Sequence, residues 1–256
     1  MRTGPLRFAI VSAETYDCPY LPGQTARTPL RLPRGRLSPE DFDELLAQGD
    51  RRAGPTLYRT QCPTCTACEP LRVATHEFVP SKSQRRVLRQ NDADIRVEVV
   101  PAHTTAERVA LYNRHRSERG LARSEADITE EEYRLHYVES CVETQEVDYF
   151  VGSRLVAVSL LDLGRTSASS VYHYFDPDES HRSLGVYSVL KEIALCAERG
   201  VEWYYLGLWV EGCGSLKYKS SYHPHERLRG GVWVQHPSPK AQPGPAPATN
   251  GGDDEE

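Results

Sequence analysis

The clearest hydrophobic pattern in the chain is one apolar stripe between positions 183 and 200. Its members recur at the three- and four-residue spacing of a single helix face: Val186, Val189, Leu190, Ile193 and Ala197. Ser183 is suited to cap the first turn, and Gly200 to end the helix in a left-handed conformation. The pattern predicts a long helix that packs one face against a core.

Polar capping residues in front of apolar positions predict four more helices. These helices begin at Ser38, Ser81, Thr104 or Thr105, and Thr129. The last one opens with a capping box and carries Tyr133, Tyr137 and Cys141 on one face. We expect these tyrosines to be core residues rather than catalytic ones.

Alternating or short continuous apolar runs predict the strands. The runs are residues 6–10, 71–78, 95–100, 149–151, 155–161, 170–175 and 201–206. The tight turn Gly152-Ser153 joins two of them into a hairpin. Residues 16–39 are rich in Pro, Gly, Thr and Arg and are expected to form an ordered loop.

The order of these elements predicts an α+β fold, with α/β-like layers of helices around one sheet. The first part of the chain is rich in loops and contains four of the seven cysteines. We therefore expect a small cysteine-containing N-terminal domain over residues 1–100 and a larger C-terminal domain over residues 101–236. Residues 237–256 are mostly Pro, Ala, Gly and acid, which predicts a disordered tail.

The composition narrows the class of protein. Hydrophobic residues make up 39% of the chain and charged residues 26%, as in an ordinary globular protein. The sequence has neither the ~18 consecutive apolar residues of a membrane span nor the apolar core of a signal peptide, so we expect a cytoplasmic protein. In that reducing compartment an odd count of seven cysteines favours metal, redox or packing roles over disulfides.

The net charge of −5 conceals a basic segment. The last four residues carry −4, so the rest of the chain carries only −1. Against this background, Lys82, Arg85, Arg86 and Arg89 place four positive charges within eight residues. The segment is either a solvated helix face or a patch that contacts phosphates.

Three cysteines, Cys62, Cys65 and Cys68, lie close enough in sequence for their thiolates to converge. With Cys18 as a fourth ligand, they could hold zinc or an iron–sulfur cluster. The alternative is that they are small buried residues that pack a turn, because no second cysteine pair follows at the distance of a zinc ribbon.

Short motifs occur in order along most of the chain. They are Cys18-Pro-Tyr-Leu-Pro22, Arg51-Arg-Ala-Gly54, Cys62-x-x-Cys65-x-x-Cys68-x-Pro70, Ser83-Gln-Arg-Arg86, Val171-Tyr-His-Tyr-Phe-Asp-Pro177, Arg182-Ser-Leu-Gly185, Tyr205-Leu-Gly207, Cys213, Tyr218-Lys219 and Tyr222-x-Pro224. Together they resemble the aminoacyl-tRNA–protein transferase family, and within it the bacterial aspartate/glutamate leucyltransferases.

The resemblance implies an acetyltransferase-like (GNAT-like) C-terminal domain behind the cysteine-containing one. It also implies leucyl-tRNA as donor, proteins that begin with Asp or Glu as acceptors, and delivery of the products to N-degron degradation. Such a transfer requires no cofactor. The chain departs from the family pattern after Cys213, where it reads Gly214-Ser215-Leu216, so arginyl-tRNA stays open as an alternative donor.

The reaction moves an amino acid from its tRNA ester to an α-amine, whose pKa is about 7.7–8.0, so holding the two substrates together supplies most of the acceleration. Candidates for binding tRNA or acceptor lie at the start of the long helix and in the basic segment: Arg182, Ser183, Gly185, Arg85, Arg86 and Arg89. As catalytic residues we expect Asp176 to orient the amine. Tyr218 and Lys219 would stabilise the oxyanion or return a proton to the ribose.

Two other classes of function compete with this one. The run Arg182-x-x-Gly185 resembles the pyrophosphate loop of acetyl-CoA-dependent N-acetyltransferases, but Tyr187 stands where a small residue would let the cofactor approach. A non-catalytic cysteine-knuckle module that binds nucleic acid would explain the cysteines and the basic segment, but not the larger second half.

Overall fold

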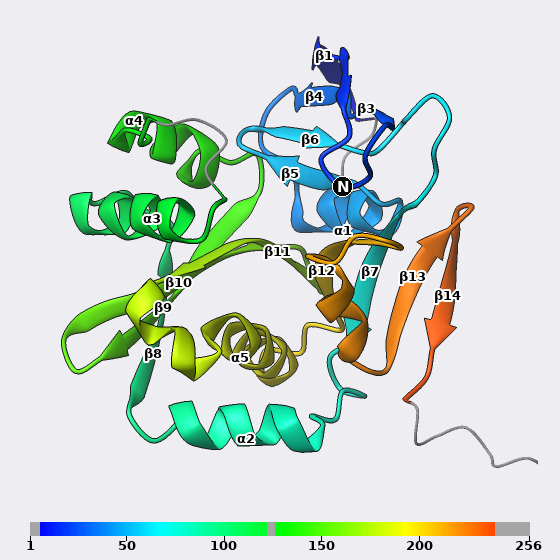
Figure 1. Cartoon of the computed structure of the whole chain (residues 1–256). Helices are drawn as coiled ribbons and strands as arrows, with labels where there is room; N and C mark the ends of the chain where they lie inside the picture. The colour runs from blue at the N-terminus through cyan, green and yellow to red at the C-terminus, as the bar shows by residue number, and fades with distance from the viewer. Residues whose placement is uncertain (1–5, 122–125, 239–256) are drawn as a thin grey trace, which may run out of the picture.

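The computed structural model describes residues 6–121 and 126–238. Its largest feature is an eight-stranded sheet that runs through the middle of the molecule (Figure 1). The strands in spatial order are β14 (Val232–His236), β13 (His225–Arg229), β7 (Cys68–Ala74), β12 (Trp203–Val210), β11 (Ser167–Phe175), β10 (Arg154–Leu163), β9 (Glu143–Val151) and β8 (Ile95–Pro101). Only β11 and β12 run parallel among these neighbours.

Helices cover both faces of this sheet (Figure 1). On one face α5 (Leu184–Glu198) packs against the strands and α2 (Lys82–Asn91) packs behind it; α3 (Ala106–Glu118), α4 (Glu130–Tyr133) and α1 (Pro39–Ala47) lie on the other. Successive side chains of a strand point to opposite faces, so β10 supplies both cores. Ala157 packs in the core around α5, whereas Val158 packs in the core under α3 and α4.

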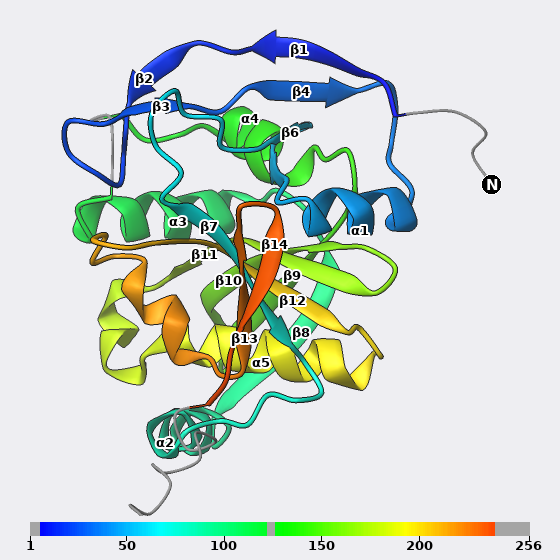
Figure 2. The ribbon, with the colours of Figure 1, turned by 90° about the vertical axis from the view of Figure 1, so that its right-hand side faces the viewer.

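A smaller sheet stands above the face that carries α3 and α1 (Figures 1 and 2). Its strands in spatial order are β1 (Phe8–Ser12), β4 (Leu30–Pro33), β6 (Thr56–Tyr58) and β5 (Arg51–Ala53), and a separate ribbon pairs β2 (Thr15–Asp17) with β3 (Thr25–Arg27). A buried ion pair ties this sheet to the large one, because Nε of Arg52 donates to a carboxylate oxygen of Asp162 at 2.7 Å.

The predicted α+β class with helix and sheet layers is confirmed. The caps expected at Ser38, Ser81, Thr105 and Thr129 are also confirmed, since each side chain accepts a backbone N–H of the first helical turn. Strands β7 and β8 belong to the same sheet as β9 to β14. Residue 100, where the first domain was expected to end, therefore lies within a strand of that sheet. The division into domains at that position stays a prediction, and the predicted tail lies outside the described residues from position 239.

Three local expectations were wrong. Cys141 is not on a helix face, because α4 continues as a π-helical turn, η1 (Arg134–Val138), and stops before it; the Cys141 carbonyl instead accepts the Leu37 N–H at 2.8 Å. Ser183 precedes α5, but its backbone is left-handed at φ 55° and its side chain makes no capping bond. The strand expected over 71–78 instead runs from Cys68 to Ala74, and it pairs with β12 as far as Cys68.

The segment expected to be a loop over 16–39 contains short strands, and the hairpin of β13 and β14 was not predicted at all. Within the described residues, no helix has the length and the apolar character needed to cross a bilayer.

Candidate active site

The two parallel strands of the large sheet separate at one end. They pair only where Ser167–Ser169 face Trp203–Tyr205. Beyond this point β11 continues along β10, and β12 shifts register between Tyr205 and Gly207 as it pairs with β7. A pocket of about 470 Å³ opens between the diverging strands, and the start of α5 lines it through Ser183, Leu184 and Gly185.

Two arginines line this pocket. Arg51, at the start of β5, lies against the backbone of Gly207. A Cβ added to Gly207 would stand only 2.5 Å from Nη1 of the Arg51 guanidinium. Arg119, which follows α3, stacks on the ring of Phe175 at 4.9 Å. Among the described residues, no carboxylate forms an ion pair or a hydrogen bond with either side chain. The pocket is therefore suited to anionic groups.

Lys219 lines the same pocket from η3 (Lys217–Ser221), and only 8% of its surface is exposed. Burial lowers the pKa of Lys219 to about 7, and the charge of Arg51 acts in the same direction. Its Nζ donates a hydrogen bond to the carbonyl oxygen of Leu208 at 3.0 Å. An amine that is partly neutral near pH 7 can accept a proton, which an ordinary lysine cannot do efficiently.

Two histidines in the pocket wall are held neutral by burial. The pKa of His173 falls to about 3, and its Nδ1 lies 2.9 Å from the hydroxyl of Ser159. Burial also lowers the pKa of His115, whose Nδ1 accepts the backbone N–H of Phe175 at 3.1 Å. Neither histidine was singled out from the sequence, although His173 lies within the Tyr-His-Tyr run of a predicted strand.

A second group that titrates near neutrality lies in the core next to the pocket. Burial raises the pKa of Glu192 to about 7. The hydroxyl of Tyr204 donates to this carboxyl group at 2.6 Å, and the hydroxyl of Ser170, a residue of the pocket wall, also bonds to it. Sequence reasoning missed Glu192 because the helical pattern places it among apolar neighbours.

The structure brings four of the predicted site residues together: Ser183, Gly185, Tyr218 and Lys219 all line the pocket. Asp176 and Arg182 lie beside the pocket. Arg182 is the last residue of η2 (Pro177–Arg182), and Asp176 directly precedes this short helix. The Asp176 carboxylate is bonded to Arg114 and Arg154, and it also accepts the backbone N–H of Asp178.

Arg182 is fully engaged as well. Its Nη1 and Nη2 donate to the two carboxylate oxygens of Asp94 at 2.8 and 2.7 Å, and its Nε donates to Glu179 at 2.5 Å. The roles expected for Asp176 and Arg182 stay predictions. In this arrangement both residues fix the short helix that leads into α5.

The remaining basic candidates lie apart from the pocket. Arg85, Arg86 and Arg89 are exposed side chains of α2, which packs on the outer side of α5 (Figure 1). None of them lines the pocket. Their predicted contact with tRNA would have to involve a part of the molecule remote from the reacting ester.

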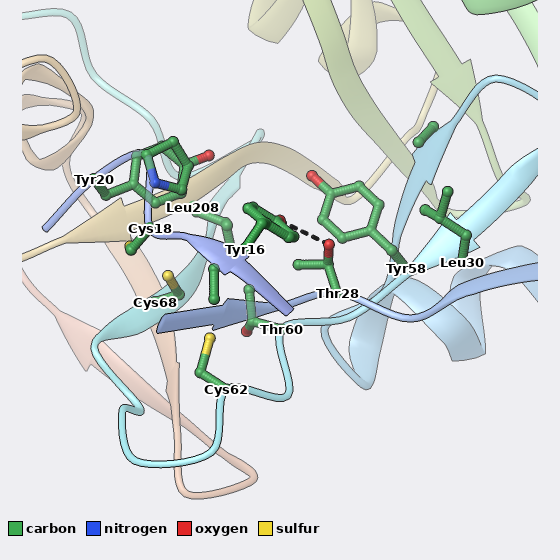
Figure 3. A pocket seen from close by; sticks show the side chains of 13 residues that line it. Tyr16, Cys18, Tyr20, Thr28, Leu30, Tyr58, Thr60, Cys62, Cys68 and Leu208 are labelled. Atoms are coloured by element: carbon green, nitrogen blue, oxygen red, sulfur yellow. Dashed lines mark hydrogen bonds between the residues drawn. The ribbon is translucent and has the colours of Figure 1, made fainter. Parts of the chain in front are cut away.

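A second pocket, of about 260 Å³, lies among the cysteines (Figure 3). Cys18, Cys62 and Cys68 line it together with three tyrosines, of which Tyr16 is hydrogen-bonded to Thr28 at 2.8 Å. The two pockets share a wall, because the side chain of Leu208 lines this one while its carbonyl oxygen binds Lys219 in the other.

The predicted gathering of cysteines is present, and Cys213 joins it. The pKa of Cys68 is raised to about 12, first by burial and then by the neighbouring thiols of Cys62, Cys18, Cys65 and Cys213. In residues 6–121 and 126–238, however, no three Cys, His, Asp or Glu side chains are placed to hold one metal ion. Zinc or an iron–sulfur cluster at these cysteines therefore stays a prediction.

Comparison with known proteins identifies the family. The sequence matches the family description "Arginine-tRNA-protein transferase" in two parts, the N terminus over residues 16–86 and the C terminus over residues 107–229. The chain belongs to the aminoacyl-tRNA–protein transferase family. The resemblance inferred from the motifs is therefore confirmed, and with it the classification as an aminoacyltransferase rather than a cysteine-knuckle module.

Similar members of the family are named "Aspartate/glutamate leucyltransferase". One from Pseudomonas savastanoi pv. phaseolicola is 33% identical over 89% of this chain and 97% of its own length. Another, from Bradyrhizobium sp., is 35% identical over 90% of this chain and 92% of its own. Among solved structures, L-PGS from Bacillus licheniformis overlaps 66% of this chain and 58% of that one at 14% identity, with a TM-score of 0.45.

Proposed function

We propose that this transferase moves leucine from leucyl-tRNA to the N-terminal α-amine of proteins that begin with Asp or Glu, in the cytoplasm, and so marks them for N-degron degradation. The observation that carries the proposal is a single pocket with two arginines, a lysine of lowered pKa and a helix N-terminus. Relatives that bear the leucyltransferase name align with 85–90% of the chain.

The reaction is the aminolysis of an ester. The acceptor's nitrogen attacks the carbonyl carbon of the leucyl ester, a C–N bond forms, and the bond from that carbon to the ribose oxygen then breaks. The proton lost by the nitrogen ends on the ribose oxygen, so the products are a lengthened protein and uncharged tRNA. The step needs no redox cofactor, because no atom changes its oxidation state.

Lys219 is the proposed carrier of that proton. With its pKa near 7 it can accept the proton from the attacking amine and return it to the leaving oxygen. Tyr218, which is 48% exposed at the pocket, would stabilise the oxyanion by donating a hydrogen bond from its hydroxyl group.

The anionic end of the tRNA is proposed to lie against the start of α5. Helix N-termini attract phosphate because their backbone N–H groups lack partners within the helix and carry partial positive charge. Arg119 adds a full charge at the pocket wall. The exposed arginines of α2 would extend the contact along the tRNA, by charge rather than by base recognition.

We expect the purified protein to transfer radiolabelled leucine from leucyl-tRNA to peptides that begin with Asp or Glu, and not to otherwise identical peptides that begin with Ala or Lys. Arginyl-tRNA in a parallel reaction tests the alternative donor. Arginine transfer without leucine transfer would correct the donor and leave the acceptor class intact. Failure with both donors on every acidic peptide would refute the proposal.

A further inference from the structure

The position of Arg51 suits it to a task that the transfer reaction needs. A transferase that acts only on Asp or Glu must recognise a side-chain carboxylate close to the amine that reacts. We propose that Arg51 binds this carboxylate and thereby sets the acceptor specificity. The inference rests on the proposed function and assigns one of its recognition steps to a residue.

Arg51 is held in the pocket by its surroundings. Its backbone pairs with Tyr58 in the ladder of β5 and β6, and the next residue, Arg52, is anchored in the buried pair with Asp162. The guanidinium lies on Gly207, which has φ +93° and no side chain to displace it. The strand thus delivers a cation to the point where β11 and β12 separate.

Within the described residues, this cation has no carboxylate in direct contact, although the charge of Asp162 lies near enough to interact with it. Two other arginines near the pocket are paired with acids, Arg52 with Asp162 and Arg182 with Asp94. Over residues 6–121 and 126–238, the side chain of Arg51 has neither an ion pair nor a hydrogen bond. A guanidinium that lines a pocket and has no acid partner is prepared to accept a planar anion through two parallel N–H bonds.

The short distance between the α-amine and the side-chain carboxylate of an acidic residue favours the acceptor, rather than the tRNA, as the ligand of Arg51. The carboxylate of Asp or Glu lies within a few Å of the α-nitrogen of the same residue. Arg51 lies close enough to Lys219 for its charge to contribute to the lowered pKa of that lysine, which is the proposed carrier of the α-nitrogen's proton. One acidic residue could therefore reach both groups at once.

The other cation of the pocket is available for the tRNA. Arg119 follows α3 and stacks on Phe175 of β11, whereas Arg51 lies on Gly207 of β12. The two charges thus belong to opposite walls of the opening between the strands. This separation lets one wall bind phosphate and the other bind the acceptor carboxylate.

The test compares Arg51→Gln and Arg51→Lys with wild type on peptides that differ only in a first residue of Asp, Glu, Asn or Ala. At saturating leucyl-tRNA, Arg51→Gln should lower kcat/KM for the acidic peptides about 10- to 100-fold, because a hydrogen-bonded charge is lost. The preference for Asp over Asn should nearly disappear, and Arg51→Lys should keep part of it. The KM for leucyl-tRNA should not change. Arg34→Gln, at an exposed position away from the pocket, is the matched control.

Calorimetric titration with the same peptides gives a readout that does not depend on transfer. Wild type should bind the Asp peptide more tightly than the Asn peptide, and Arg51→Gln should bind both alike. Equal loss on all four peptides, or a raised KM for leucyl-tRNA with an unchanged Asp preference, would overturn the assignment. If wild type binds the Asp peptide selectively but transfers neither amino acid, the transfer function fails while the assignment of Arg51 stands.

Discussion

Replacing Lys219 by glutamine should lower kcat for leucine transfer about 10²- to 10⁴-fold, the usual contribution of a positioned proton carrier. The substitution removes the group that takes the proton from the amine but leaves the pocket open. The circular dichroism spectrum and the KM for leucyl-tRNA should stay close to those of wild type. Lys217→Gln, at an exposed position in the same short helix, should keep nearly full activity.

The pH profile separates a proton carrier from a merely structural lysine. The acceptor amine must be unprotonated to attack, and its pKa is about 7.7–8.0. Lys219, with a pKa of about 7, must also be unprotonated to act as a base, so activity rises with pH through two ionisations. Below about pH 6, where both groups are mostly protonated, the rate of the wild type should fall about 100-fold per pH unit, and that of Lys219→Gln about tenfold. Identical profiles for both proteins would contradict the role of Lys219.

Asp162→Ala should lower the free energy of unfolding by about 3–5 kcal/mol, because it leaves the buried guanidinium of Arg52 without a counter-charge. Both side chains are almost inaccessible to water, with 0% and 1% of their surfaces exposed. Thr144 also loses its hydrogen bond to the other carboxylate oxygen, at 2.6 Å. Urea denaturation followed by fluorescence measures the change.

The control for this substitution is Glu98→Ala, which removes the partner of Arg96 at a surface where both side chains are about half exposed. Exposed pairs contribute less than about 1 kcal/mol, so the control should unfold near the wild-type midpoint. A similar small effect for Asp162→Ala would mean that water reaches the Arg52 guanidinium, contrary to the burial described above.

The parts of the fold that depend on local chemistry could be read from the sequence. Ser81 and Thr129 cap their helices because the capping bond forms within one turn, and the stripe from Val186 to Ile193 faces the core because its spacing matches the helix. Cys141 could not be placed in this way. The helical spacing continues as far as that residue, but a π-helical turn ends the helix and a distant backbone contact with Leu37 takes over.

The sequence predicted those parts of the candidate site that residues close together in the chain form. It did not predict the parts that depend on contacts between distant strands. Gly185 and Lys219 were found because their motifs stand out along the chain, and both line the pocket. Arg51 belongs to a motif of the resemblance, but its place in the pocket follows from the contact of β5 with Gly207 of β12, which no local pattern encodes. Conversely, Arg182 looked available for an anion, and only the fold shows that Asp94 and Glu179 occupy it.

If transfer takes place in the pocket at the start of α5, a side chain that fills this pocket must prevent it. Gly185 lines this pocket, and a Cβ added to it would meet nothing within 4 Å, so Gly185→Phe should fold and fill the space where the substrates bind. Gly214 is equally open but lies outside the lining, which makes Gly214→Phe the matched control.

The decisive measurement is the rate of leucine transfer from leucyl-tRNA to an Asp-initiated peptide by these two variants. We predict a loss of at least about 100-fold for Gly185→Phe, since even small displacements of bound reactants have effects of that size. Gly214→Phe should transfer near the wild-type rate, and both variants should unfold near the wild-type midpoint. Undiminished transfer by a folded Gly185→Phe variant would contradict the claim.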